Sequence, residues 1–318
     1  MNTKSLPHIA VLALNPAVDI SYEVPQLVED RKVRADRTRY YPGGNGINVA
    51  RSLAELGTPF HCCSVVGGES GDLLLRLLGN ALGSQHRVFR VAGETRVNAT
   101  LLQKSPPSQY EVDSCGPEIP AELLDEITLC FLEECGTGYG ILTGSTPPGV
   151  PDDYSRQLAQ QIKRQGGRAV IDAHGPVLQA ALQAEPYLVR LNRYVLEMMT
   201  KQRLQTIPAV AAAARELQRR GIACVCISLG TEGALLADAD NVYHCAAPRV
   251  HVQSTVGCGD ALVAGLVTAA RRGDDGREML RLGVLCGSAT AAHPGTELFR
   301  REDIERLSDA VNVQVLDL

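Results

Sequence analysis

Short apolar runs alternate regularly with amphipathic segments over the middle of the chain, and this alternation leaves few folds open. The apolar runs are residues 168–171, 187–191 and 223–228, and the segments with helical spacing are 154–165, 175–183 and 209–220. The run at 223–228 is continuously apolar, which is typical of a strand buried on both faces of a sheet. Repeated strand–helix units predict an α/β fold, with a mostly parallel sheet covered by helices on both faces.

Two other segments have a different pattern. Residues 20–41 and 87–103 alternate apolar and polar side chains and carry many charges. Such alternation is typical of strands that are exposed on one side. We therefore predict a small separate sheet, formed by strands inserted at about 18–41 and 86–115, within one domain that spans 1–318.

Composition restricts the partners. The chain has 318 residues, 45% hydrophobic, 21% charged and with a net charge of −5, and no basic run suggests nucleic acid as a partner. No apolar run reaches the roughly 18 residues of a membrane span. Residues 1–7 lack the apolar core of a signal peptide, and the ten cysteines show no zinc-site spacing. These features predict a cytoplasmic protein with reduced cysteines.

The stretch 254–265 carries the clearest chemical pattern. Gly257 and Gly259 flank Cys258, Asp260 follows at once, and apolar residues with helical spacing come next. A glycine turn that opens a helix presents free N–H groups and the positive end of the helix dipole, which together bind phosphate. Asp260 beside such a site would be a general base for an attacking hydroxyl. On this pattern alone, Asp260 as a simple helix cap remains equally possible.

Three further patterns lie where ligands collect in α/β sheets. Asp19 follows the first apolar run, 8–14, at the carboxyl end of that predicted strand, although a turn-capping aspartate has the same pattern. Residues 43–46 form a second glycine-rich start of a helix, which can bring backbone close to a ligand or can be an ordinary junction. Residues 229–234 follow the strand 223–228 and also resemble a hairpin turn.

Five motifs in one order resemble the ribokinase-like carbohydrate kinases of the pfkB family, and within it the phosphofructokinase and tagatose-6-phosphate kinase branch. The motifs are Leu14–Asp19, Gly43–Arg51, Thr143–Gly149, Ser228–Ala234 and Thr255–Asp260. Each motif is weak alone, but the five together are specific and the similarity runs from about His8 to Leu307. The resemblance implies a ribokinase-like fold with a small β-sheet lid.

The resemblance also implies phosphoryl transfer from ATP to a hydroxyl of a hexose phosphate, with Mg²⁺ as a cofactor. Asp260 would be the base, and the amides of Gly257, Cys258 and Gly259 would form the anion hole. The implied sugar site comprises Asp19, Gly44, Asn45 and Asn48, with Lys32, Arg96 and Ser145 around the substrate phosphate. The implied nucleotide site comprises Asn192, Ser228, Gly230, Thr231, Gly233 and Thr255. A lid excludes water, and an exposed edge of its sheet could pair two subunits, so we expect a homodimer.

The sequence departs from the family in four places, one of which is Cys258 in place of the usual alanine. Asn45 stands where the 1-phosphofructokinase and tagatose-6-phosphate branches commonly have lysine, which favours fructose 6-phosphate over fructose 1-phosphate or tagatose 6-phosphate as the substrate. Arg190-Leu191 replaces the usual Lys-Pro. The family motif Asn-x-x-Glu, whose glutamate helps to organise Mg²⁺, begins at Asn192 but has Val195 in the last position. Glu197 lies two residues further, about 200° around a helix, and would face away.

Three functions therefore remain open. The first is an active hexose-phosphate kinase, with weakened or altered metal use and no residue assigned to the metal. The second is a phosphosugar- or nucleotide-binding regulator that has lost turnover through Val195. The third is a kinase of an unphosphorylated sugar or nucleoside, against which Lys32 and Arg96 argue because such a substrate has no need of them.

Overall fold

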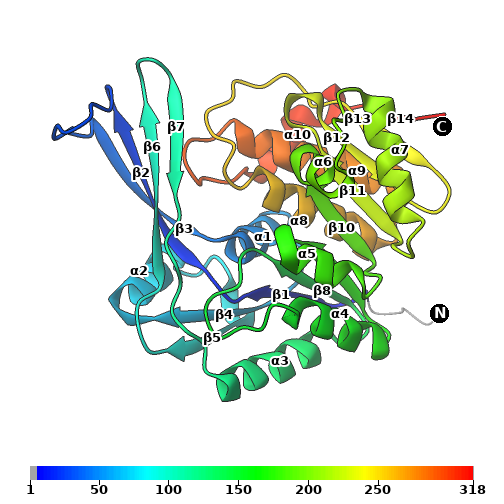
Figure 1. Cartoon of the computed structure of the whole chain (residues 1–318), viewed down its shortest axis with the longest axis horizontal. Helices are drawn as coiled ribbons and strands as arrows, with labels where there is room; N and C mark the ends of the chain where they lie inside the picture. Colours follow the sequence, from blue (N-terminus) through cyan, green and yellow to red (C-terminus); the bar gives the residue numbers. More distant parts are fainter. Residues whose placement is uncertain (1–5, 318) are drawn as a thin grey trace.

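The computed structural model describes residues 6–317 and shows a large α/β body with a small sheet standing at one side (Figure 1). The sheet of the body has the order β14-β13-β12-β11-β10-β9-β8-β1-β4-β5. Its parallel strands are β1 (Ile9–Ala13), β4 (His61–Gly67), β5 (His86–Val91), β8 (Tyr139–Thr143), β9 (Arg168–Asp172), β10 (Leu188–Asn192) and β11 (Cys224–Ser228). The antiparallel strands β12 (Ala234–Ala237), β13 (Val242–Cys245) and β14 (Val313–Val315) extend one edge.

Helices cover both faces of this sheet, as predicted. One face carries α1 (Asn45–Glu55), α2 (Gly68–Leu78), α8 (Cys258–Arg272), α9 (Gly276–Ala291) and α10 (Arg301–Leu307). The other carries α3 (Ala121–Cys135), α4 (Tyr154–Arg164), α5 (Gly175–Leu182), α6 (Arg193–Thr200) and α7 (Ile207–Gln218). Because successive strand residues point to opposite faces, Ile9 and Val11 pack in one core while Ala10 and Leu12 pack in the other.

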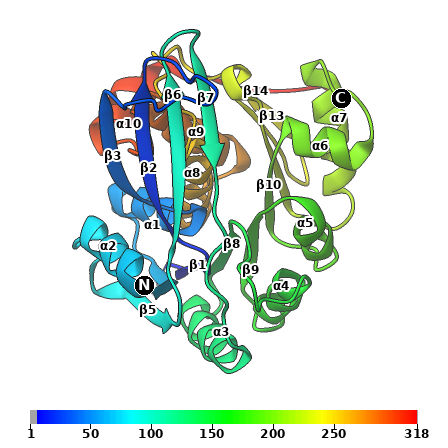
Figure 2. The ribbon, with the colours of Figure 1, turned by 60° about the vertical axis from the view of Figure 1, so that its left-hand side comes forward.

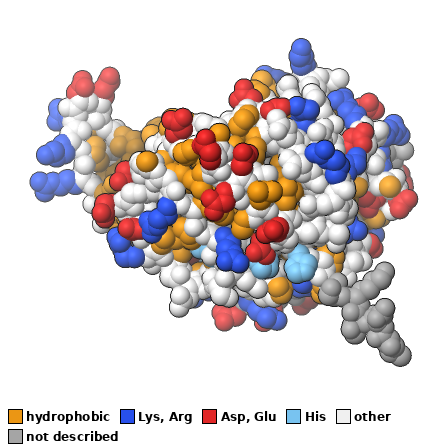
Figure 3. Space-filling model, turned by 90° about the horizontal axis from the view of Figure 1, so that it is seen from below, with side chains coloured by type: hydrophobic (Ala, Val, Ile, Leu, Met, Phe, Trp, Pro, Cys, Tyr) orange, Lys and Arg blue, Asp and Glu red, His pale blue; other side chains and the backbone are white. Residues whose placement is uncertain are grey.

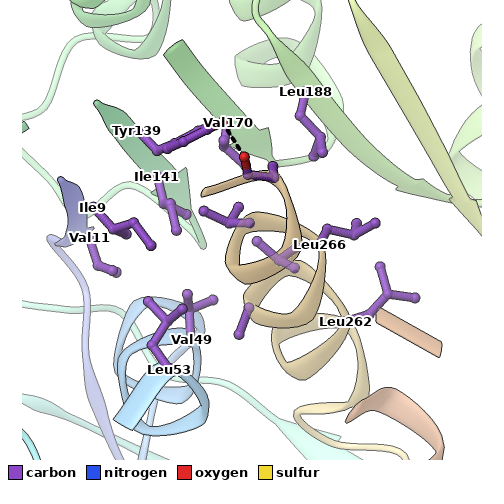
Figure 4. Close-up of a cluster of buried hydrophobic side chains, with 14 of the residues drawn as sticks. Ile9, Val11, Val49, Leu53, Tyr139, Ile141, Val170, Leu188, Leu262 and Leu266 are labelled. Carbon is purple, nitrogen blue, oxygen red and sulfur yellow. Dashed lines mark hydrogen bonds between the residues drawn. The ribbon is translucent and has the colours of Figure 1, made fainter. Parts of the chain in front are cut away.

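Helix α8 is anchored deep in the body. Its residues from Asp260 to Ala270 are all buried, and the helix packs among side chains of β1, β8, β9, β10 and α1 (Figure 4). Near its far end the hydroxyl of Tyr139 donates a hydrogen bond of 3.0 Å to the carbonyl of Ala270. A helix packed on all sides has little freedom to shift, so the N-terminus of α8 is held firmly at the carboxyl ends of the strands.

The lid is a four-stranded sheet with the order β3-β2-β6-β7 (Figure 2). Its strands are β2 (Ala17–Val24), β3 (Arg37–Gly43), β6 (Arg96–Gln103) and β7 (Ser108–Val112). The predicted second lid segment began too early, because residues 86–91 form β5 and pair with β4 at the edge of the main sheet. The side chains of β5 are all exposed or half-buried, so its polar–apolar alternation looks like that of a lid strand.

The helices, the cysteines and the surface charge are relevant to the partners and the location of the protein. No helix in residues 6–317 is long and apolar enough to cross a membrane. All ten cysteines are free thiols. Charged side chains of both signs are interspersed over the face shown in Figure 3, without an extended area of one sign. The first residues of the segment used to exclude a signal peptide, 1–5, lie outside the described residues.

Candidate active site

Asp260 lies in the first turn of α8, where two glycine-rich segments far apart in the sequence meet. Gly257 precedes the helix with a φ of 79°, in the left-handed region that favours glycine. Asp260 is 4% exposed, and its two carboxylate oxygens accept hydrogen bonds from Nδ2 of Asn45 and Nδ2 of Asn48, both at 2.9 Å. Since both asparagines belong to α1, the structure brings together the helix starts at 43–46 and 257–260.

The surroundings raise the pKa of Asp260 to about 7. Burial is the largest cause, and the carboxylate of Asp172 adds repulsion. Hydrogen bonds from Asn48 and Asn45 and the charge of Arg190 act in the opposite direction. A carboxylate whose pKa lies near neutrality is matched to accepting a proton from a hydroxyl and releasing it again.

Arg190 has a role in this site that was not predicted from the sequence, where it was noted only as a departure from the family pattern. Its Nη1 lies 3.2 Å from Oδ1 of Asp172, and its Nη2 donates a hydrogen bond of 3.0 Å to the hydroxyl of Ser228. A Cβ on Gly259 would lie 2.5 Å from Nη2, so the glycine allows the start of α8 to approach the guanidinium. Burial works against the charge, yet attraction to Asp172 and their hydrogen bond leave the pKa of Arg190 raised. The buried Nε has no partner within the described residues.

A cleft of about 780 Å³ extends from Arg190 along the end of the sheet. All six residues of the predicted nucleotide site line it: Asn192, Ser228, Gly230, Thr231, Gly233 and Thr255. Cys258 and Gly259 line it at the start of α8. The apolar part of the wall was not predicted, because its residues belong to no motif: Val250, Val252, Leu262, Val284 and Ala291. A polar end beside an apolar wall suits a polyphosphate joined to a flat ring.

A second cavity, of about 550 Å³, lies on the other side of Arg190. Asn45, Asp172, Arg190 and Asn192 line it, and Val195 stands in its wall where the family motif has glutamate. Glu197 faces elsewhere, because its Oε1 accepts a hydrogen bond of 2.7 Å from the amide of Leu204. The side chain of Asn192 caps α6 by accepting from the amide of Val195 at 2.8 Å.

Asp19 lies on the face of the lid that turns toward the body. Its carboxylate accepts hydrogen bonds from Nδ2 of Asn98 at 3.0 Å and from the hydroxyl of Thr296 at 3.1 Å. Burial raises the pKa of Asp19, and the hydrogen bonds from Thr296 and Asn98 limit the rise. Arg51 of α1 donates to the carbonyls of Pro42 and Thr296, which ties both segments to the body. Nothing in the sequence pattern indicated Asn98, Thr296 or Arg51 as contacts of this region.

The predicted phosphate-binding residues fall into two groups. Arg96 and Ser145 lie on either side of Asn15, since Nε of Arg96 donates to the carbonyl of Asn15 at 3.1 Å and Nδ2 of Asn15 donates to the hydroxyl of Ser145 at 2.9 Å. Arg96 also borders an open surface pocket of about 650 Å³ beside α2. Lys32 lies apart from this group, exposed in the loop between β2 and β3 at the tip of the lid.

The remaining predicted residues lie at the two helix starts. Gly44 precedes α1 with a φ of 89°, and the amide of Cys258 donates to the carbonyl of Thr255 at 3.4 Å. Burial raises the pKa of the Cys258 thiol to about 12, so this thiol is protonated at neutral pH and is no nucleophile. Within residues 6–317 no three His, Cys, Asp or Glu side chains are grouped as metal ligands.

The chain is similar in sequence and in structure to known phosphofructokinases. The chain is 34% identical over 305 residues to the ATP-dependent 6-phosphofructokinase isozyme 2 of Mycobacterium tuberculosis, covering 94% of this chain and 88% of that protein. Phosphofructokinase-2 from Escherichia coli, solved with substrates and products, has a TM-score of 0.88 and 30% identity, covering 96% of this chain and 99% of that one. The same enzyme has been solved in complex with fructose 6-phosphate and in a tetrameric inhibited form.

A more distant structure supports the fold alone. Ribokinase from Arabidopsis thaliana, complexed with ribose and ATP, has a TM-score of 0.76 and 21% identity, covering 96% of this chain and 99% of that one. The model of the pfkB family carbohydrate kinases matches residues 12–302. The chain is therefore a member of the pfkB family of carbohydrate kinases, with the ribokinase-like fold that its motifs predicted.

Proposed function

We propose that this protein transfers the terminal phosphoryl group of ATP to a free hydroxyl of a hexose phosphate, with fructose 6-phosphate as the substrate. The observation that carries the proposal is the position of Asp260 at the start of α8. There, Cys258 and Gly259 border the cleft that suits a nucleotide, while Asn48 of the predicted sugar site donates a hydrogen bond to Asp260. A base in this place lies between a phosphoryl donor and an acceptor hydroxyl.

In this proposal Asp260 accepts the proton of the sugar hydroxyl as its oxygen forms a bond to the terminal phosphorus. The bond from that phosphorus to the bridging oxygen breaks, and ADP leaves through the cleft. The amides of Gly257, Cys258 and Gly259 stabilise the transferring group, together with the positive end of α8. Asp19, Gly44 and Asn48 hold sugar hydroxyls, and closure of the lid excludes water.

A phosphorylated substrate is favoured by the group around Asn15. Arg96 keeps a buried positive charge there, and the hydroxyl of Ser145, which accepts from Asn15, remains able to donate to a phosphate oxygen. Lys32 adds a second cation only if the lid closes over the substrate. The free thiols, in turn, support the prediction that the protein acts in the reducing cytoplasm.

The described residues do not build a site for Mg²⁺. Glu197 is engaged by Leu204, and Asp172 is paired with Arg190 and accepts from Thr143. We propose that Mg²⁺ arrives on the phosphates of ATP, whose charge it neutralises, and that the protein adds no carboxylate of its own to hold it.

Replacing Val195 with glutamate is expected to lower the Mg²⁺ concentration that gives half the maximal rate, by about tenfold. The new carboxylate would enter the wall of the second cavity beside Asp172 and Asn192. The measurement is the rate of ADP formation as Mg²⁺ is varied at saturating ATP, with V195Q as the uncharged control. An unchanged Mg²⁺ dependence in V195E would show that this position does not limit metal use.

The proposed activity is tested by ADP formation with ATP and a panel of acceptors: fructose 6-phosphate, fructose 1-phosphate, tagatose 6-phosphate, fructose and ribose. Fructose 6-phosphate should give the highest kcat/KM, and the unphosphorylated sugars the lowest. Turnover of fructose or ribose alone would favour a kinase of unphosphorylated sugars. Thermal stabilisation by ATP and a phosphosugar without ADP formation would instead identify a binding protein without turnover.

We also propose that the protein forms a homodimer through the outer face of the lid. Residues that share a register position share a face of the sheet, so Tyr40, Val97, Tyr110 and Val112 all lie on the face opposite Asp19. All four are exposed, and Ile20 and Leu101 lie between them on the same face. An apolar face of this kind is typical of a surface that pairs with a second copy of the same chain.

Two charges on that face should separate the subunits. Y110E/V112E is expected to sediment as a monomer where the unaltered protein sediments as a dimer, because the carboxylates would be buried at the interface. Q109E adds charge on the opposite face of the same strand and should leave the dimer intact. A dimer that survives Y110E/V112E would place the interface elsewhere.

A further inference from the structure

The two oxygens of the Asp260 carboxylate each face an amide N–H group from α1. Asn45 and Asn48 lie three residues apart, on one face of that helix, and their Nδ2 atoms approach Oδ1 and Oδ2 respectively. We propose that Asn45 is a positioning residue, which holds Asp260 ionised and fixes the plane of its carboxylate, and that it is not a ligand of the sugar. This inference rests on the proposed function and concerns the same site.

The geometry distinguishes the two protonation states of Asp260. An ionised carboxylate has acceptors on both oxygens, so it satisfies both amide donors at once. A protonated carboxyl would turn one O–H toward an N–H, so one of the two asparagines would have to rotate and present its Oδ1 instead. Asn48 alone would fix one oxygen and leave the carboxylate free to rotate, whereas the second donor, Asn45, fixes both oxygens.

The charged and titratable groups around Asp260 come from every element packed against the start of α8. On β9, Asp172 opposes ionisation of Asp260, and on β10 Arg190 favours it. Arg190 is shared with Asp172, to which it is paired directly. On α8 itself the Cys258 thiol is uncharged at neutral pH. The amides of Asn45 and Asn48 on α1 are therefore the groups whose donors are committed to Asp260 itself.

The same contacts argue against Asn45 as a sugar ligand. One N–H of its side chain is used by Asp260, and its Oδ1 lies against Gly144, 3.3 Å from the position a Cβ would take there. Asn45 starts α1 directly after Gly44, so the backbone places this side chain by the first turn of the helix. The substitution of asparagine for the lysine of related branches thus changes the surroundings of the base.

The test is the pH dependence of kcat in a graded series, N45A and N45D. N45A removes the donor, so the acid limb of the profile should move to higher pH by about one unit, with roughly a fivefold loss of kcat at pH 7 that is recovered at pH 9. N45D places a carboxylate beside Asp260 and should move the limb further. KM for fructose 6-phosphate should stay within about twofold of its original value. N80A, on the exposed surface, is the control.

A readout without turnover separates this proposal from the proposed function. The unfolding free energy is measured as a function of pH for four proteins: the unaltered protein, D260N, N45A and D260N/N45A. Because the folded-state pKa of Asp260 is raised, its protonation stabilises the fold at low pH, and this stabilisation is lost as pH rises through that pKa. In N45A this loss of unfolding free energy should be complete at a pH about one unit higher.

Each outcome decides something. Suppose that N45A shifts the pH at which the loss of unfolding free energy is complete, but the protein phosphorylates no member of the panel. This result would reject the proposed function and keep the role of Asn45 in ionising Asp260. The inference would be overturned if N45A changed neither the pH at which the loss of unfolding free energy is complete nor the acid limb of kcat, whether or not N45A is less active. A raised KM for fructose 6-phosphate without any change in pH dependence would return Asn45 to the sugar site.

Discussion

Asparagine in place of Asp260 is expected to lower kcat by about 10³-fold while leaving the affinity for ATP within about twofold. The substitution keeps the size of the side chain and removes its ability to accept a proton. The cleft that suits the nucleotide is lined by neighbours of Asp260 in the chain, Cys258 and Gly259, and by loops of β10, β11 and β13, none of which depends on this carboxylate. The loss should therefore appear in the chemical step.

The measurement pairs the rate of ADP formation with a direct titration of ATP binding. In the unaltered protein, log kcat should fall below a pH of about 7, because Asp260 acts only when ionised and its pKa lies there. D260N should show no such limb in its residual rate. A variant that keeps more than about a tenth of kcat would remove Asp260 from the role of base.

The same substitution has a predicted effect on stability. Folding raises the pKa of Asp260 from 3.8 to about 7, so above pH 7 the folded state holds a buried charge at a disadvantage. D260N carries no such charge. The unfolding free energy of D260N, relative to that of the unaltered protein, should therefore increase by an amount on the order of 4 kcal/mol as pH rises from 4 to 8. A catalytic group that weakens the fold is a known trade-off between stability and activity.

The fold could be predicted from the sequence because its elements carry local periodicity. The buried strands β9, β10 and β11 are short apolar runs, and the covering helices α4 and α7 have an amphipathic pattern. The lid boundary was placed wrongly for the same reason, since β5 has the alternation of a half-exposed strand but pairs with β4. Periodicity reports exposure on one side and does not report which sheet a strand joins.

The site could be predicted where its residues stand at the end of a strand or the start of a helix. Asn192, Ser228 and Asp260 occupy such positions. Asp19 does not: it is the third residue of the lid strand β2, and not, as predicted, at the carboxyl end of the first strand. Contacts between residues that are far apart in the sequence have no local sequence pattern from which they could be predicted. The hydroxyl of Thr296 reaches Asp19 across 277 residues, and Asn98 reaches it from another lid strand. The role of Arg190 also depends on partners from β9 and β11, which only the assembled sheet brings together.

Methionine in place of Arg190 is the second substitution with a large expected effect, because this guanidinium serves two purposes. It neutralises Asp172, which is 7% exposed, and it lies at the start of α8 beside the cleft that suits the nucleotide. R190M leaves Asp172 buried without its partner, which should lower the unfolding free energy by about 3–5 kcal/mol. It also removes positive charge from beside the transferring phosphoryl group, which should reduce kcat by about 10²- to 10³-fold.

The double variant R190M/D172N separates the two effects. With the carboxylate replaced by an amide, no unpaired charge remains, so most of the lost stability should return while kcat remains as low as in R190M. R190K retains a positive charge but cannot bridge Asp172 and Ser228 in the same way, and it should fall between the unaltered protein and R190M. The measurements are chemical denaturation and the rate of ADP formation for all four proteins. Recovery of kcat in R190M/D172N would mean that Arg190 acts only as the partner of Asp172. A kcat that stays low even at pH 9, where Asp260 is ionised, would mean that the guanidinium acts on the phosphoryl group itself.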